Sequence, residues 1–348
     1  MSTRASSSAV GYKLTIGGTS MSQDKNDGVQ QIIFEDHIDM VGMLTARIGG
    51  GEGQPKWNFK IGDEVKLKLG SGSKEIFARE VISVEPGFEV GGISSITVRA
   101  LDKLHRLGRG RKTRFWEEMK DSDVASEVGA ESGLGVECDP TEKMHPYILQ
   151  RNETNVAFLK RLAARNNFTL RVEDNKLLFK KASFRSREVE IAMGGNLRSL
   201  RMAFNSSDMV QKVVVRGWDP SKKEEIVGVA SASDVVPMGD GELGAEAAGK
   251  FGESTAYITD VPVASQQQAQ EIALSEMERL ARQFCRGSGS VEGDDSLRAG
   301  AMVTLSGMPE MAGGKFFVIA SRHVISLRAG YSTEFTFCSN TFGTKTSG

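Results

Sequence analysis

The sequence predicts an α+β protein, mainly β, in which a β domain, an α/β middle and a second β domain follow one another. Three observations support this. Short apolar and polar alternations separated by glycine-rich turns fill residues 10 to 101, with no helical pattern between them. A helical period replaces them between Lys103 and Asn167. Strand patterns then return and continue towards the carboxyl end, interrupted by a long amphipathic segment, Ser265–Phe284.

Composition limits the class of protein. The 348 residues leave room for two or three domains, at roughly 100–200 residues each. A net charge of -1 disfavours a dedicated nucleic-acid binder. Cys138, Cys285 and Cys338 are odd in number and widely spaced, which predicts reduced thiols in a protein folded in the cytosol. The opening "MSTRASSSAV" lacks the apolar segment of a secretory signal. No window contains the ~18 apolar residues of a membrane span, so membrane insertion is not expected.

Residues 10–102 are expected to form the first β domain, after a disordered tail at residues 1–9. Its clearest hairpin runs from Glu64 to Val84. Val65, Leu67 and Leu69 alternate with Lys66 and Lys68, "GSGSK" forms the turn, and Ile76-Phe77 begin the return strand. Strands at this spacing without intervening helices indicate an antiparallel barrel or sandwich.

Residues 103–187 are expected to form the α/β middle. In "SDVASEVGAESGLGV" a helix begins with Ser122 as its N-cap and ends at glycine. Thr154 is expected to cap a second helix, which Asn166-Asn167 would end in the left-handed conformation. Its apolar stripe consists of Val156, Phe158, Leu159, Leu162 and Ala163, and Lys160, Arg161 and Arg165 lie towards its carboxyl end. The pattern indicates a packing helix docked on the strand that follows, itself part of a hairpin turned on Asp174-Asn175.

Residues 188–348 are expected to form the second β domain, with an inserted loop and helix at 231–290. A polar, glycine- and alanine-rich loop is predicted from Ser231 to Glu253. The helix over Ser265–Phe284 would place Ile272, Met277, Leu280 and Phe284 near one face. Closing strands follow.

No catalytic, cofactor or metal site is predicted. His37, His105, His145 and His323 have no HxH or HExxH spacing, and no GxSxG is present. "EDHID", residues Glu35–Asp39, is interpreted as a polar strand end rather than a metal site. "GGGEG", residues Gly49–Gly53, lacks the Lys-Ser/Thr of a phosphate loop and is interpreted as a hairpin loop.

Three further features have a chemical and a plainer interpretation. Asp294 and Asp295 could form a carboxylate pair for cell-wall cleavage, but a tight turn between the helix and the next strand is favoured. The basic run Lys103–Arg114 could hold nucleic acid, but an exposed loop meeting an acidic neighbour in a ring is favoured. Trp57, Trp116 and Trp218 are isolated in the sequence, so no stacking platform is expected.

The stretch "HPYILQRNETNVAFLKRLAARNNFTLRVEDNKLLF", residues 145–179, resembles the signature of the phage late control protein D family and of the VgrG proteins of type VI secretion. The matching residues are Gln150, Glu153, Thr154, Asn155, Phe158, Leu159, Arg161 and Leu162. Three more stretches are similar to protein D homologues: residues 96–128, 213–230 and 308–335, the last with its Gly-Tyr-x-Thr. Together they extend the resemblance from about Val10 to Gly343.

This resemblance implies a baseplate hub in which two similar antiparallel β-barrels flank an α/β insert. Three copies would form a ring with pseudo-sixfold symmetry, joining a threefold spike to the sixfold inner tube without any catalytic residue. VgrG continues into an OB-fold and a needle, whereas this chain stops at Gly348, so a separate spike protein is expected. The implied partners are two further copies, the spike, the inner tube or its initiator, and other baseplate proteins. Assembly in the bacterial cytoplasm and incorporation into a phage tail or injection particle are expected. The alternative is a β-barrel hydrolase or ligand-binding protein on the same scaffold.

Overall fold

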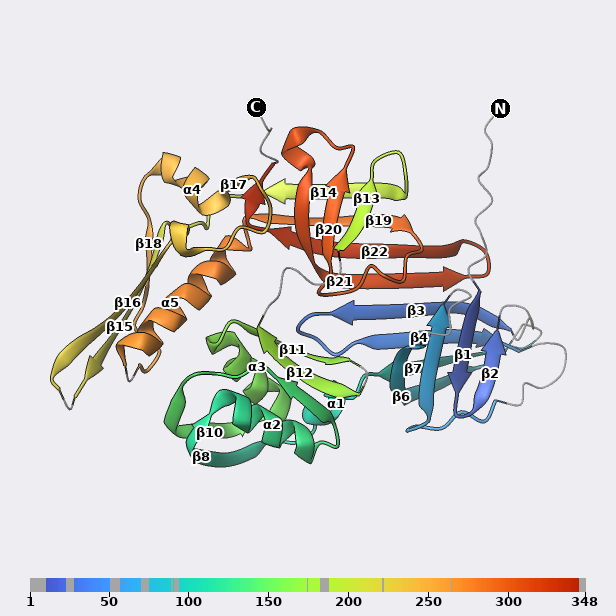
Figure 1. The fold of residues 1–348 in the computed structure, drawn as a ribbon. Helices are drawn as coiled ribbons and strands as arrows, with labels where there is room; N and C mark the ends of the chain where they lie inside the picture. Colours follow the sequence, from blue (N-terminus) through green and yellow to red (C-terminus); the bar gives the residue numbers. More distant parts are fainter. Residues whose placement is uncertain are drawn as a thin grey trace.

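The computed structural model describes residues 11–22, 28–50, 57–69, 75–88, 90, 94–173, 175–181, 188–220, 222–263 and 265–343. The expected tail at residues 1–9 and the "GSGSK" turn lie outside the described residues, as do Asp174 and the last three residues of "GGGEG". The fold is mainly β with few helices, as predicted (Figure 1).

A curled, half-barrel sheet of thirteen strands joins the two ends of the chain in the part that the structure describes. Its amino-terminal strands are β1 (Tyr12–Ile16), β2 (Thr19–Ser22), β3 (Val29–His37), β4 (Met43–Gly49), β5 (Glu64–Leu69), β6 (Glu75–Gly87) and β7 (Ser95–Leu101). Its carboxy-terminal strands are β13 (Glu188–Ala192), β14 (Leu197–Phe204), β19 (Cys285–Glu292), β20 (Met302–Ser306), β21 (Gly314–Ser326) and β22 (Gly330–Ser339). Strands β3 and β21 join the halves, pairing antiparallel from Gln31↔Ser326 to His37↔Ala320.

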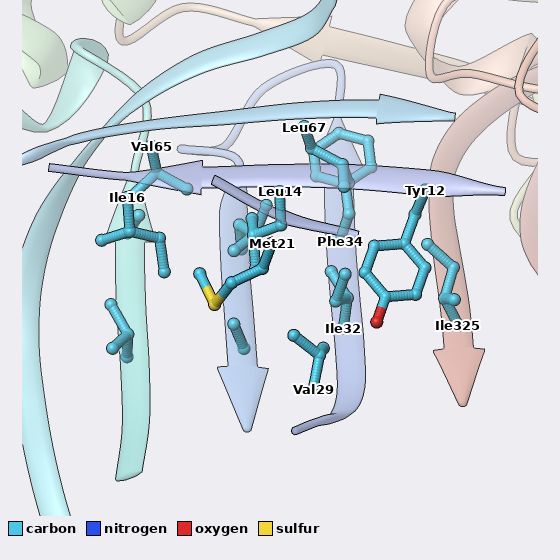
Figure 2. Close-up of a cluster of buried hydrophobic side chains, with 14 of the residues drawn as sticks. Tyr12, Leu14, Ile16, Met21, Val29, Ile32, Phe34, Val65, Leu67 and Ile325 are labelled. Carbon is cyan, nitrogen blue, oxygen red and sulfur yellow. The ribbon is translucent and has the colours of Figure 1, made fainter. Parts of the chain in front are cut away.

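The amino-terminal half buries an apolar core under its strands. Val65, Leu67 and Leu69 of β5 are buried and alternate with the lysines, which confirms the predicted pattern. Figure 2 shows Leu14, Ile32 and Phe34 in this core, together with Ile325 from β21 of the other half. Because one core takes side chains from both ends of the chain, the two halves pack as a continuous structure.

Four strands of the large sheet, β2, β13, β14 and β19, are not among the strands predicted from the sequence. Strand β19 reads "CRGSGSVE", and its glycines lower its β propensity. A Cβ at Gly287 would lie 2.3 Å from the ring of Phe337, and one at Gly289 would lie 2.7 Å from that of Phe335. The glycines therefore leave room for the aromatic rings of β22. Strand β13 pairs parallel to β20, a departure from the expected antiparallel order.

The insert contains α1 (Leu104–Leu107), β8 (Lys112–Lys120), α2 (Asp121–Glu131), β9 (Gly135–Cys138), β10 (Met144–Glu153), α3 (Asn155–Arg165), β11 (Phe168–Glu173) and β12 (Lys176–Lys181). The helical reading of 103–167 was therefore wrong for β8, β9 and β10. Strands β8 and β10 pair with each other, and β9 lies parallel to β12. Charged residues on the outer faces of β8 and β10 obscure the alternation of apolar and polar residues that would predict these strands.

The two predicted N-caps of the insert had different outcomes. Thr154 caps α3, since its hydroxyl accepts a hydrogen bond from Ala157 N at 3.2 Å. Ser122 does not cap α2, which begins at Asp121 after Lys120. The Ser122 hydroxyl instead accepts from Thr141 N at 3.3 Å, and Ser122 N donates to Thr141 Oγ1 at 3.1 Å. Because the Ser122 hydroxyl is bonded to Thr141, it is not available to cap α2.

A small unit, here called the arm (residues 212–281), projects from the second half (Figure 1). It consists of β15 (Lys212–Asp219), β16 (Glu224–Ser231), β18 (Thr255–Ile258) and α5 (Gln266–Ala281), with the strands in the order β16-β15-β18. Strands β15 and β16, expected in the second barrel, therefore form a separate sheet. The expected loop at 231–253 contains η2 (Ala232–Asp234), β17 (Glu242–Leu243), α4 (Gly244–Ala248) and η3 (Gly249–Phe251). Strand β17 pairs with β23 (Thr341–Phe342), and η4 (Glu310–Ala312) precedes β21.

Helix α5 forms where predicted, but of the predicted stripe only Met277 is buried within the helix. Its buried residues are Ala269, Ala273, Met277 and Ala281, whereas Ile272 and Leu280 are only partly buried and Phe284 lies beyond the helix in another core. A Cβ at Gly228 of β16 would lie 2.1 Å from the carbonyl of Ala269. The helix backbone thus lies directly against the strand, which favours small residues over large ones at the contact.

Candidate functional site

The signature stretch forms a corner between β10 and α3, built around Gln150, which is fully buried. Gln150 Oε1 accepts from Arg114 Nε at 2.8 Å, and its Nε2 donates to Glu153 O and to Asn155 Oδ1, both at 3.0 Å. A buried amide needs these partners, because an unsatisfied polar group is costly. Gln150 and Asn155 therefore fix the turn into the helix.

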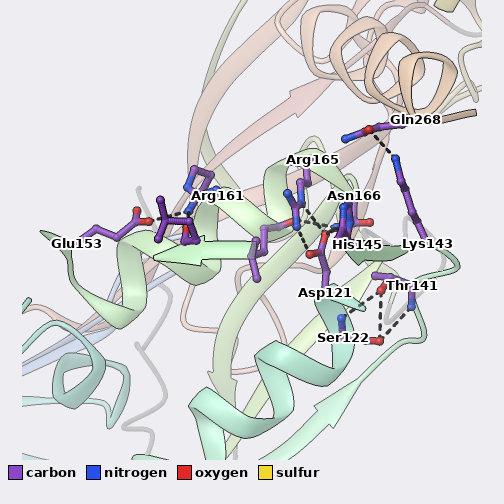
Figure 3. A network of polar contacts seen from close by, with 12 residues as sticks. Asp121, Ser122, Thr141, Lys143, His145, Glu153, Arg161, Arg165, Asn166 and Gln268 are labelled. Atoms are coloured by element: carbon purple, nitrogen blue, oxygen red, sulfur yellow. Dashed lines mark hydrogen bonds and ion pairs between the residues drawn. The ribbon is translucent and has the colours of Figure 1, made fainter. Parts of the chain in front are cut away.

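The helix of the signature is packed as predicted. Phe158, Leu159 and Leu162 are completely buried, and Phe158 stacks on Trp116 with ring centroids 5.2 Å apart. Trp116, isolated from the other tryptophans in the sequence, is thus a buried residue of this core. Arg161 ties the outside of the corner, donating to Glu153 Oε1 and to Leu149 O, both at 2.7 Å (Figure 3). The motif residues serve the fold of the insert.

A second polar cluster surrounds Asp121, whose side chain is 1% exposed. Arg165 Nε and Asn166 Nδ2 donate to Asp121 Oδ2 at 2.6 and 2.7 Å, and His145 Nε2 lies 3.6 Å from the same oxygen (Figure 3). Burial would raise the pKa of Asp121, but the contacts with His145, Arg165 and Asn166 outweigh it and lower the pKa to about 2. The ionised carboxylate therefore stabilises the junction of α2, α3 and β10.

We expect this carboxylate to make stability depend on pH. A folded-state pKa near 2 against an ordinary 3.8 corresponds to about 2 kcal/mol, fully present above pH 4 and lost as the pH falls towards 2. Denaturant unfolding of the wild type and of Asp121→Asn between pH 2 and pH 7 measures this effect. The wild type should have the higher free energy of unfolding at pH 7, and the difference between the two proteins should disappear as the pH falls below 4. A gap that stays constant with pH would contradict the assignment.

Polar contacts join the end of α3 to the arm. Asn167, at φ 53°, takes the left-handed conformation predicted for the helix end, whereas Asn166 does not. Arg282 Nη2 donates to Asn167 Oδ1 at 2.8 Å, and Asn167 Nδ2 donates to Glu278. Lys143 Nζ donates to Gln268 Oε1 at 2.5 Å (Figure 3). The arm is therefore braced against the insert at both ends of α5.

The other candidate residues lie apart from one another. Glu35–Asp39 spans the polar end of β3, as predicted, where Asp36 pairs with Arg298 at 2.8 Å. His323 lies in the core stacked on Phe34, and its burial lowers its pKa to about 3. Within the described ranges, no group of three or more His, Cys, Asp or Glu side chains could hold a metal ion. Cys138, Cys285 and Cys338 are free thiols.

The basic run Lys103–Arg114, predicted to be an exposed loop, is a loop only at Lys103 and at residues 108–111. It contains α1 and the start of β8, and several of its charges are paired within the chain. Arg106 Nε donates to Glu80 at 2.9 Å, while Lys112 and Arg114 contact Glu131 at 3.1 and 2.6 Å. These partners belong to β6 and α2 of the same molecule. The expected contact of the run with an acidic neighbour in a ring stays a prediction.

Asp294 and Asp295 lie in a turn, but between β19 and β20 rather than directly after the helix. Asp294 Oδ1 accepts from Ser296 N at 2.9 Å, and Asp294 N donates to Thr333 Oγ1 at 3.0 Å. The side-chain oxygen of an Asn at position 294 can accept the same hydrogen bond from Ser296 N. We therefore expect Asp294→Asn with Asp295→Asn to leave tail assembly and any peptidoglycan degradation by the assembled particle unchanged in a turbidity assay. Normal assembly with lost degradation would contradict this.

A row of polar side chains, here called the polar row, crosses five strands of the large sheet, alternating with buried residues such as Phe34 and Phe335. Its members lie in register on β14, β19, β22, β21 and β3: Ser199, Ser290, Glu334, Arg322 and Glu35. The two serine hydroxyls are 2.6 Å apart, and Arg322 lies 3.0 Å from Glu334 and 3.5 Å from Glu35. The row thus crosses the joint between the two halves.

A groove of about 1010 Å³ lies along the polar row. One of its ends is apolar and is lined by Met40, Val41, Met43 and Leu101. Their strand neighbours Phe34, Ser321 and Phe335 are buried, and Ser321 and Phe335 also line the groove. The polar row is therefore open in the single chain, along a groove whose lining is partly polar and partly apolar. Among the described helices, none is both long enough and apolar enough to cross a membrane.

Comparison with known proteins agrees with this architecture. A model of the family described as the Alg8 N-terminal domain matches residues 8–326. No curated protein matches the chain. The 43 kDa tail protein of prophage MuSo2 from Shewanella oneidensis is 15% identical with a TM-score of 0.72, over 94% of this chain and 98% of its own. A tail protein from Neisseria meningitidis MC58 is 12% identical with a TM-score of 0.71, over 95% and 97%.

A third solved structure is the E. coli c3393 protein, described as a component of the type VI secretion system. It is 10% identical with a TM-score of 0.63, over 96% of this chain and 79% of its own. At these identities the likeness shows the fold. The resemblance to phage tail and type VI secretion proteins is thereby confirmed at the level of the fold.

Proposed function

Because this chain belongs to the Alg8 N-terminal domain family and has the fold of phage tail proteins, we propose that it is a structural component of a contractile tail or injection machine. Its place is the baseplate hub, between a separate threefold spike and the sixfold inner tube. It acts through surface contacts, not as an enzyme. It assembles in the bacterial cytoplasm and leaves as part of the particle.

The observation that carries the proposal is the open groove along the polar row of the large sheet. The groove crosses the joint between β3 and β21. Such a surface suits the wall of a water-filled passage around an axis.

Symmetry explains why two halves are useful. Each copy contributes two β halves, which hold the amino-terminal and the carboxy-terminal strands of the large sheet, with the insert at 103–187 between them in the chain. Three copies therefore supply six similar positions around one axis, which can match a sixfold tube on one side and a threefold spike on the other. Closing such a ring needs a head-to-tail contact on both flanks of each copy. Obligate contacts of this kind typically bury more than about 2,000 Å².

Electron microscopy of the assembled particle tests the proposal. We expect three copies of this chain, coaxial with the tube and lying between the spike and the first tube ring. Six copies, or density on the outer arms of the baseplate, would contradict the hub. A saturable small-ligand site on a monomer with turnover of glycans would favour the alternative, a β-barrel hydrolase or binding protein.

A further inference from the structure

Strand β16 lies at one edge of the arm sheet and carries Ile226, Val227 and Val229. An exposed edge presents unpaired N–H and C=O groups, which can pair with a strand of another molecule. The opposite edge, β18, is only four residues long and is a poor template. Strand β16 has eight residues and would be the stronger template if its edge were open.

The backbone groups along this edge are bonded to side chains. Val227 N donates to Gln266 Oε1 at 3.1 Å, and Gln266 Nε2 donates back to Val227 O. Val229 N donates to Gln270 Oε1 at 3.0 Å, and Gln270 Nε2 donates back to Val229 O at 2.7 Å. Ser231 N donates to Asp234 Oδ2 at 2.8 Å. Every second N–H from Val227 to Ser231 therefore has a side-chain partner.

The spacing of the two glutamines fits the strand. Four residues along a helix rise about 6 Å, and two residues along a strand rise about 6.7 Å. Gln266 and Gln270 are four apart, so each reaches one of two backbone groups that are two apart, Val227 and Val229. Each amide places an N–H donor beside a C=O acceptor, as the peptide groups of a neighbouring strand would. Gly228 permits this arrangement, because a larger residue there would strike the helix backbone at Ala269.

We propose that Gln266 and Gln270 imitate a neighbouring strand and close β16 against strand addition by a second copy of this chain. The partner they exclude is β16 itself, because an antiparallel pair of identical edges is self-complementary about a twofold axis. Such a contact would join arms pairwise. Pairing of two arms through β16 would compete with a head-to-tail ring of three copies. When the β16 edge is covered by the two glutamines, the arm remains available for other contacts.

The test compares the double variant Gln266→Ala with Gln270→Ala against Gln267→Ala, an exposed residue of the same helix that bonds to Glu271 at 3.0 Å. We expect the double variant to fold, with faster hydrogen exchange at the Val227 and Val229 amides in dilute solution. In sedimentation experiments it should self-associate as concentration rises, more than the control and the wild type. Adding Val227→Pro should abolish the extra association, because it removes an edge donor that the ladder with β15 does not use.

Two results would overturn the proposal. One is faster exchange at Val227 and Val229 without any association beyond that of the Gln267→Ala control. The other is extra association that persists after Val227→Pro. If the double variant does not fold, Gln270→Ala alone opens Val229, and Val229→Pro is then the blocking change in the same comparison. Unchanged exchange at Val229 in that variant would also count against the proposal.

Discussion

Replacing Leu159 by Asp should lower the free energy of unfolding by at least about 3 kcal/mol, because it places a charge in a core that offers it no partner. Leu159 is completely buried among Trp116, Phe158 and other apolar residues of the insert. The side chain also loses its packing, which adds a cavity term to the cost of burying a charge. Circular dichroism and denaturant titration of the purified chain measure the effect.

The control is Ala157→Asp, on the exposed face of the same helix. It adds the same charge in the first turn, where the helix dipole favours an acidic side chain. We therefore expect its stability to equal or slightly exceed that of the wild type. A Leu159→Asp protein that melts like the Ala157→Asp control would show that α3 is not a packing helix.

Local patterns predicted several elements correctly. The alternation in β5, the Thr154 cap and the left-handed Asn167 each depend on residues a few positions apart, so the sequence displays them directly. Ser122 failed as a cap because its hydroxyl bonds to Thr141, a partner that the local sequence does not reveal. In the same way, β19 was missed because its glycines make sense only beside the rings of Phe335 and Phe337.

The candidate site likewise has features that the local sequence shows and features that depend on distant partners. Gln150, Asn155 and Arg161 stood out in the signature, but their burial and bonds depend on Arg114, which lies on another strand. The polar row joins Glu35 to Arg322, residues that only the pairing of β3 with β21 brings together. Long-range strand register determines both features, and no periodicity in the sequence encodes it. The sequence therefore predicted the elements better than the surface they build.

Deleting the gene for this chain should leave cells without extended tubes and sheaths, as seen by electron microscopy of lysates. A symmetry adaptor must be present before the first sixfold ring can form on a threefold spike, so its loss blocks assembly at the start. An accessory protein on the outside of the baseplate would leave normal tails of reduced activity. Tails of normal length in the deletion strain would therefore contradict the hub.

Complementation separates the role of the fold from that of individual residues. The wild-type gene and the Ala157→Asp control should both restore tails, whereas Leu159→Asp should restore fewer or none, because the insert is strongly destabilised. Asp294→Asn with Asp295→Asn should also restore tails, since those carboxylates lie in a turn of the second half. If only the carboxylate variant failed to restore them, the turn would carry an assembly or catalytic role that a structural hub does not need.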